Sequence, residues 1–166
     1  VVVQNAGRYR VGLRADYGLS QRLAIYGLTA WRRDVFGGVK RQFEEGAGLT
    51  WHALVPKPQL LDFELGAGLT QRLDTFDKDQ DFATGRAAVV YRYYFAEKTY
   101  FDANGIYLHN FENSEDYEWD GKVSLVAPLS NILAMKIAYT SHFRNRPPTG
   151  IEQWDRTFSA GIQATW

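Results

Sequence analysis

Hydrophobic and polar residues alternate along most of the chain, and the pattern is clearest at its end. Between Trp154 and Trp166 every second residue is Trp, Arg, Phe, Ala, Ile, Ala or Trp, and the residues between them are Asp, Thr, Ser, Gly, Gln and Thr. Because successive side chains of a β-strand point to opposite faces, this pattern predicts a strand with one apolar and one polar face. A series of such strands that ends on an aromatic residue is typical of a closed barrel in a bacterial outer membrane.

The same alternation recurs upstream and predicts nine strands separated by turn residues. The expected strands are Arg8–Leu19, Leu23–Arg33, Phe43–Val55, Leu60–Arg72, Phe82–Phe95, Thr99–Phe111, Tyr117–Leu129, Ile132–Arg144 and Trp154–Trp166. We therefore expect an all-β fold, an antiparallel up-and-down transmembrane β-barrel, with residues 1–166 forming a single domain.

The connections between these strands alternate in length. Longer ones are expected at 34–42, 73–81, 112–116 and 145–153. Bacterial barrels have short periplasmic turns and longer outer loops, so the last strand should run inward. Nine strands is an odd number, whereas single-chain bacterial barrels have an even one. We therefore expect ten or twelve strands when the barrel is complete, with N-terminal strand sequence missing here; the alternative is that residues 1–4 pair as a short closing strand.

Each predicted strand has a face expected to meet lipid. The residues assigned to it are Val11, Leu13, Leu28, Leu49, Trp51, Phe63, Leu65, Leu69, Val89, Tyr91, Val123, Leu125, Met135, Ile137, Tyr139, Phe158 and Ile162. On the second strand this places Ala24, Tyr26, Leu28 and Ala30 outward.

The triplet Gly-Leu-Thr recurs at 27–29, 48–50 and 68–70. We interpret its glycines as inward residues that relieve crowding and allow the strands to curve.

The opposite face is expected to line the interior of the barrel. Its charged residues are Arg10, Arg14, Asp16, Glu44, Asp62, Glu64, Arg86, Arg92, Asp102, Glu118, Asp120, Lys122, Lys136, Arg144 and Asp155. A soluble, lipocalin-like barrel would instead place its apolar face inside. Charges of both signs on the second face favour a wet or ion-paired interior, because an unpaired charge in an apolar core is very costly.

The composition excludes several classes of function and of membrane anchor. The chain has 19 Lys and Arg against 19 Asp and Glu, so there is no basic excess to indicate nucleic acid, and it has no Cys. No apolar run approaches the roughly 18 residues that a membrane helix needs.

The acidic segment 77–81 has the first carboxylates of a calcium loop, but Phe82 stands where that loop needs Gly. Adjacent strand residues such as Ser141 and His142 point to opposite faces and cannot form a nucleophile–base pair. No catalytic residue, metal ligand or cofactor is therefore expected.

The C-terminal third resembles a known family. The residues that carry the resemblance are Ala138–Pro148, Asp155–Thr157 and the final aromatic, and Tyr9–Asp34 is similar to the middle portion of that family. The family is that of the salt-induced outer-membrane proteins, which has no assigned biochemical function. The resemblance implies an outer-membrane barrel and transfers no functional residue.

Together these patterns predict a non-enzymatic protein of the bacterial outer membrane, either a narrow pore or a structural barrel with a charged interior. The alternatives are an outer-membrane enzyme acting on lipid or peptide, and a scaffold barrel that docks a partner through its outer loops. The expected partners are membrane lipid and lipopolysaccharide, whose phosphates Arg32–Arg33 and Lys40–Arg41 could meet from an outer loop.

Overall fold

The structure, a computed structural model, describes residues 8–35, 37–130 and 132–164. In this part of the chain, nine strands pair in chain order into one sheet, which confirms the predicted all-β, antiparallel up-and-down fold. The strands are β1 (Arg8–Gly18), β2 (Leu23–Asp34), β3 (Val39–Leu54), β4 (Gln59–Asp74), β5 (Asp79–Ala96), β6 (Thr99–Asn110), β7 (Tyr117–Pro128), β8 (Leu133–Arg144) and β9 (Trp154–Ala164). The described residues include no helix long and apolar enough to cross a membrane.

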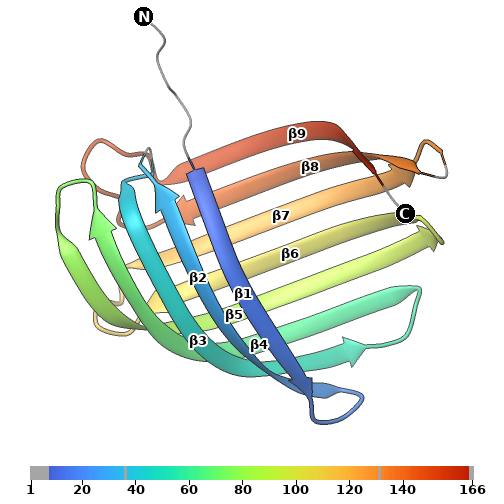
Figure 1. Cartoon of the computed structure of the whole chain (residues 1–166), viewed down its shortest axis with the longest axis horizontal. Coiled ribbons are helices and arrows are strands. Elements are labelled where there is room, and N and C mark those ends of the chain that lie inside the picture. The colour runs from blue at the N-terminus through green and yellow to red at the C-terminus, as the bar shows by residue number, and fades with distance from the viewer. Residues whose placement is uncertain (1–7, 36, 131, 165–166) are drawn as a thin grey trace, which may run out of the picture.

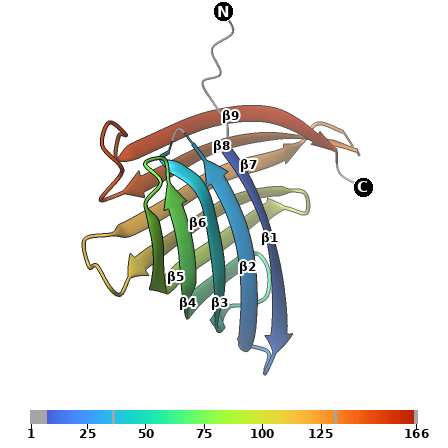
Figure 2. The ribbon, with the colours of Figure 1, turned by 60° about the vertical axis from the view of Figure 1, so that its left-hand side comes forward.

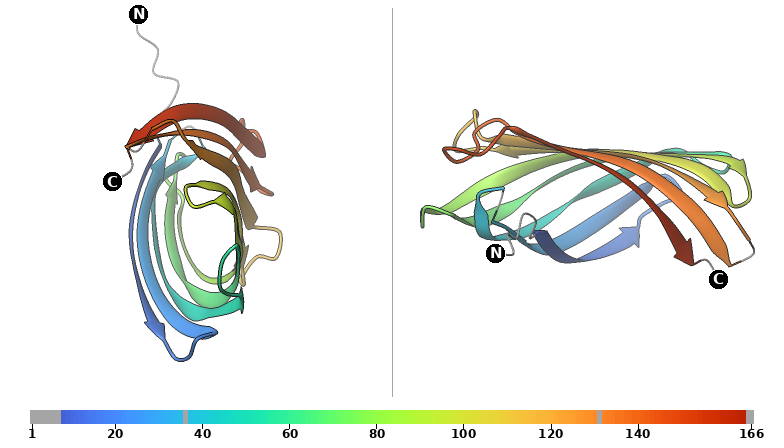
Figure 3. Two further views of the ribbon diagram at one scale, coloured as in Figure 1. Left: turned by 90° about the vertical axis from the view of Figure 1, so that its right-hand side faces the viewer. Right: turned by 90° about the horizontal axis from the view of Figure 1, so that it is seen from above.

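The sheet is strongly curved. In Figures 1 and 2 the wall formed by β1–β4 faces the wall formed by β6–β9, and β5 lies where the sheet turns between them. Seen end-on (Figure 3, left), the sheet curls nearly into a ring, with β1 and β9 along its two free edges. No described residue of β1 pairs with β9. The proposed closing strand at residues 1–4 and the terminal Trp166 lie outside the described residues.

The two ends of the sheet differ in their connections. We call the end where β2, β4, β6 and β8 finish the loop end, and the opposite end the turn end. The expected long connections at 34–42 and 73–81 are wrong: β3 begins at Val39 and β5 at Asp79, which leaves only residues 35–38 and 75–78 between strands. The β3–β4 and β4–β5 ladders extend into these segments, because Val39 pairs with Asp74 and Leu73 pairs with Asp79. Only 111–116 and 145–153 exceed the turns at the other end.

The convex face of the sheet is apolar and open. Leu13 is 76% exposed, Leu65 71% and Phe158 69%, although all three are large hydrophobic residues. With the exception of Leu28, every residue predicted to face lipid lies on this face. Most of the buried residues lie instead on the concave face, and many of them are polar or charged: Arg32, Asp34, Gln42, Thr50, Glu64, Thr70, Arg72, Thr84, Asn110, Glu118, Ser124 and Arg144.

The predicted orientation of β2 is wrong. Ala24, Tyr26, Leu28 and Ala30 lie on the concave face, and Ile25 and Trp31 lie on the convex face. Leu28 lines a small space of about 30 Å³ on the concave face, together with Tyr26 and Arg86. The physical reason is that this orientation directs Arg32 into the interior, where it finds a carboxylate on the opposite wall.

The recurring glycines of β3 and β4 make room for one tyrosine. A methyl group added to Gly48 would lie 2.6 Å from the Tyr26 hydroxyl and would also meet the Leu65 carbonyl oxygen. Gly66, which pairs with Gly48, is covered by the same hydroxyl. These two positions are therefore Gly because the Tyr26 side chain, 3% exposed, rests directly on the backbone.

Candidate functional site: a charged cluster across the interior

Six side chains at the loop end connect the two walls of the sheet. We call them the bridging cluster; they are Arg32 of β2, Gln42 of β3, Arg72 of β4, Asp116 before β7, Glu118 of β7 and Arg144 of β8. The strand positions alternate so that each of these residues points to the concave face. Because β2 and β4 lie on the opposite side of the curl from β7 and β8, their side chains can meet only by crossing the interior (Figure 2).

Glu118 is the centre of the bridging cluster. Its Oε1 accepts a hydrogen bond from Arg72 Nη2 at 2.6 Å, and its Oε2 accepts one from Arg32 Nη2 at 3.2 Å. Arg32 Nη2 and Arg72 Nε also donate to Gln42 Oε1, each at 2.9 Å. The five residues Arg32, Gln42, Arg72, Glu118 and Arg144 are between 1% and 8% exposed. The cluster therefore places paired, buried charge across the interior at this height.

Arg144 is the least satisfied member of the cluster. Its Nε lies 3.5 Å from Glu118 Oε1 and 3.8 Å from Asp116 Oδ1, which are ion-pair contacts without hydrogen-bond geometry. Within the described residues, Arg144 Nε and Nη1 and Arg32 Nε are buried without a hydrogen-bond partner. Three guanidinium groups thus share two carboxylates within the cluster, Asp116 and Glu118, and Gln42 donates a hydrogen bond to a third carboxylate, Glu44.

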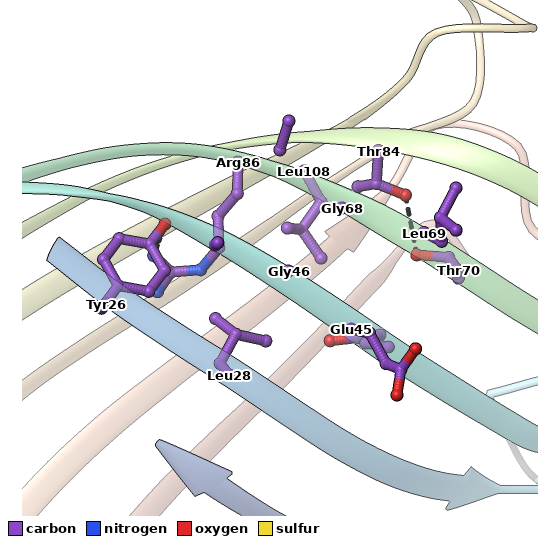
Figure 4. A pocket seen from close by; sticks show the side chains of 13 residues that line it. Tyr26, Leu28, Glu45, Gly46, Gly68, Leu69, Thr70, Thr84, Arg86 and Leu108 are labelled. Atoms are coloured by element: carbon purple, nitrogen blue, oxygen red, sulfur yellow. Dashed lines mark hydrogen bonds between the residues drawn. The ribbon is translucent and has the colours of Figure 1, made fainter. Parts of the chain in front are cut away.

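A second group of charges lies nearer the turn end and stays on one wall. Arg14 binds Asp16 through Nε and Nη2, and its Nη1 lies 2.8 Å from Glu64 Oε1. Arg86 Nη1 contacts the other oxygen of Glu64. Both guanidinium groups lie over the Tyr26 ring, with Arg14 Cζ 4.4 Å and Arg86 Cζ 5.5 Å from the ring centroid. Figure 4 shows Tyr26 against Arg86 of β5, with Leu28 on the same strand as Tyr26.

The other predicted interior charges also lie on the concave face. Arg92 binds Asp102 at 2.5 and 3.1 Å, Asp120 contacts His142 Nδ1 at 2.7 Å, and Arg10 lies 3.6 Å from Glu44. Asp62 contacts His52 Nδ1 at 2.6 Å. Lys122 faces Asn104 and Thr140, Lys136 faces Val126 and Gly161, and Asp155 faces His142 across the ladder.

Sequence reasoning misplaced one of the most important residues of the site. Arg32 was expected on an outer loop with Arg33, but it lies within β2 on the concave face and is 8% exposed. Of these two arginines, Arg33 is the one that is exposed on the convex face. Gln42 was not singled out at all, although it is 1% exposed and holds two arginines. The alternation along β3 could have placed Gln42 inside, because Gln42 is two residues from the predicted interior Glu44. Arg32 faces Gln42 across the β2–β3 ladder and therefore lies on the same face.

The Ser141–His142 pair and the acidic segment 77–81 form neither a catalytic pair nor a metal site among the described residues. Ser141 and His142 point to opposite faces as predicted, and the Nδ1 atom of His142 is held by Asp120. In the acidic segment, Asp77 contacts Lys40 at 2.5 Å. The described residues contain no group of three or more His, Asp or Glu side chains placed to hold a metal ion.

Comparisons with known proteins agree with this architecture. A family model described as "Protein of unknown function, DUF481" matches residues 3–166. Among solved structures, the fold is similar to that of the NanC porin in a rhombohedral crystal form, with a TM-score of 0.65 and 10% sequence identity, over 96% of this chain and 79% of that one. No curated protein matches the chain in sequence.

Proposed function

This chain belongs to the DUF481 family of proteins of unknown function, and we propose that it is a non-enzymatic β-barrel of the bacterial outer membrane that forms a narrow, charge-lined pore. The observation that carries the proposal is the distribution of side chains: the convex face exposes Leu13, Leu65 and Phe158, and the concave face holds the ion pairs. An apolar belt outside and a polar interior are what a barrel in lipid requires.

The pore is narrowest at the bridging cluster. Ion pairs between Glu118 and the arginines of β2 and β4 cross the interior, so solutes must pass beside them or displace them. Charged side chains at a constriction select permeating ions by sign. Similarity in fold to a porin supports this proposal, as does the resemblance of Ala138–Pro148 to the salt-induced outer-membrane proteins.

A structural barrel without transport is the second candidate. It is favoured by the burial of the same cluster, because buried, hydrogen-bonded charges hold opposite walls of a sheet together. Glu118 is only 2% exposed and leaves no obvious passage at its own position.

Planar-bilayer recordings of the purified full-length protein separate the two candidates. A pore gives small unitary currents, and the variant Arg72→Ala/Glu118→Ala raises the unitary conductance because it removes a pair that crosses the interior. The matched control is Arg146→Ala/Glu115→Ala, an exposed ion pair between connections, which should leave conductance unchanged. Silence of both the wild type and the Arg72/Glu118 variant, with the protein inserted, would reject the pore and support the structural barrel.

A further inference from the structure

The convex face carries two charged residues where hydrocarbon is expected. Glu45 of β3 and Arg156 of β9 are exposed on this face, and each lies two residues nearer the middle of its strand than an aromatic, Phe43 or Trp154. Other convex charges, such as Arg33 and Asp81, are level with these aromatics or beyond them. Among the described residues, Glu45 and Arg156 are therefore the charges inside the aromatic rim.

Among the described residues, neither Glu45 nor Arg156 has a partner of opposite charge. Glu45 has Thr29 and Leu69 as its cross-strand neighbours, and makes no ion pair with a described residue. Its carboxylate lies away from the Tyr26–Arg86 pair in Figure 4. Arg156 has Ser141 as its cross-strand neighbour and stacks on the Trp154 ring at 4.7 Å, again without a carboxylate among the described residues. Charged side chains facing hydrocarbon are costly and are usually retained for a function.

The two charges have opposite signs and lie equally far inside the aromatic residue of their own strand. Each is displaced by two residues, about 7 Å of strand, from the aromatic that marks the rim of its own strand. Because all copies of an outer-membrane protein are inserted in the same orientation, equal depths are brought level when two copies lie side by side. Glu45 of one copy can then reach Arg156 of another, while β3 and β9 of a single copy lie far apart around the sheet (Figure 1).

The side chains next to the two charges differ in size. One step further toward the middle of the sheet, Gly27, Ala47 and Ala67 lie side by side on β2, β3 and β4, so the convex surface is shallow there. At the corresponding step on β9, Phe158 projects and is 69% exposed. An aromatic that projects beside the arginine matches a shallow patch beside the glutamate.

We propose that the convex face of β2–β4 around Glu45 binds the convex face of β9 around Arg156 of a second copy of this chain. The contact is heterologous, so each pair leaves one face of each kind free and association continues beyond dimers. Pairing the two charges removes both from the hydrocarbon. The inference rests on the proposed membrane location and adds a partner to it.

Cysteine cross-linking in outer membranes tests this contact, because the chain has no Cys of its own. Differently tagged copies carrying Glu45→Cys and Arg156→Cys are expressed together and oxidised. The expected result is a disulfide between the two tags, with little cross-linking when either variant is expressed alone. Val123→Cys, on the convex face of β7, replaces Glu45→Cys as the matched control. Cross-linking of Val123→Cys as strong as that of Glu45→Cys, or none for either, would overturn the proposal.

Charge exchange provides an independent measurement. Glu45→Arg should lower the oligomer fraction of the detergent-extracted protein several-fold, and Glu45→Arg/Arg156→Glu should restore it. A double variant as dissociated as the single one contradicts the pairing. Flotation of each variant with lipid vesicles reports insertion separately, so loss of association with normal flotation rejects only the contact, whereas loss of flotation by the wild type rejects the membrane location.

Discussion

Glu118 on β7 accepts a hydrogen bond from Arg72 on β4 at 2.6 Å, although β5 and β6 lie between these strands in the sheet. The bond joins two walls of the sheet that the backbone hydrogen bonds connect only through β5 and β6. Its removal should therefore lower the stability of the folded sheet and, if the proposed pore forms, change its conductance.

Glu118→Gln should destabilise the folded protein. Arg72 and Arg32 would lose the carboxylate that neutralises them while remaining buried, and breaking a buried pair in this way costs about 3–5 kcal/mol. The measurement is the free energy of unfolding in urea from lipid vesicles. Glu152→Gln is the matched control, because Glu152 is exposed on a connection and its change should stay within about 0.5 kcal/mol. Equal effects of the two substitutions would contradict the bridging role.

Arg144→Gln should behave differently, although Arg144 belongs to the same cluster. Its Nε and Nη1 have no hydrogen-bond acceptor among the described residues, and Arg72 competes for the same carboxylates. We expect a loss of less than about 1 kcal/mol, because little pairing is removed. If the interior conducts, removal of this positive charge should also shift the reversal potential in a salt gradient toward cation preference. A loss of stability as large as that of Glu118→Gln would show that Arg144 is fully paired.

Gly48→Ala should be more harmful than an alanine substitution is at most glycines of the sheet. The new methyl group would meet the Leu65 carbonyl oxygen and the Tyr26 hydroxyl, and overpacking of this kind costs about 1–3 kcal/mol. Gly161→Ala on β9 is the comparison, since an added methyl group there has nothing within 4 Å. Thermal unfolding monitored by electrophoretic mobility of the folded band would measure both. A neutral Gly48→Ala would mean that Tyr26 does not rest on this strand.

Ile137→Arg tests the face assigned to lipid. The side chain lies on the convex face between Met135 and Tyr139, and an arginine near the middle of a bilayer costs about 2–4 kcal/mol. Thr157→Arg places the same group on the concave face, where it should cost little. Refolding into lipid vesicles across a urea series gives both values. Equal stability of the two variants would exclude hydrocarbon contact at Ile137.

The alternation of residues was enough to predict nine strands and to orient most of them. On β9 and β3 only one of the two faces is apolar, so the assignment of Phe158 or Leu49 was unambiguous. On β2 both faces carry apolar residues, and the orientation depends on contacts that the local pattern does not contain. Tyr26 requires Gly48 and Gly66 beneath it, and Arg32 requires a carboxylate 86 residues later in the chain.

The charged site was predictable as a set of residues but not as an arrangement. Parity placed Glu118 and Arg144 in the interior, yet nothing local indicates that Glu118 reaches β2 and β4 rather than a neighbouring strand. That choice depends on the curvature of the whole sheet. Gln42 has no charge and therefore gave no signal, although its carbonyl oxygen positions two guanidinium groups.

The position of Glu118 in the chain also constrains the order of folding. Arg32 and Arg72 precede their shared carboxylate by 86 and 46 residues, so hairpins formed from β2–β5 leave both guanidinium groups without it until β7 is in place. Contacts this distant in sequence form late, because the intervening chain must first be ordered. Arrival of β7 then connects the first half of the chain to the second in a single step, and the curved sheet should acquire its resistance to unfolding only at that point.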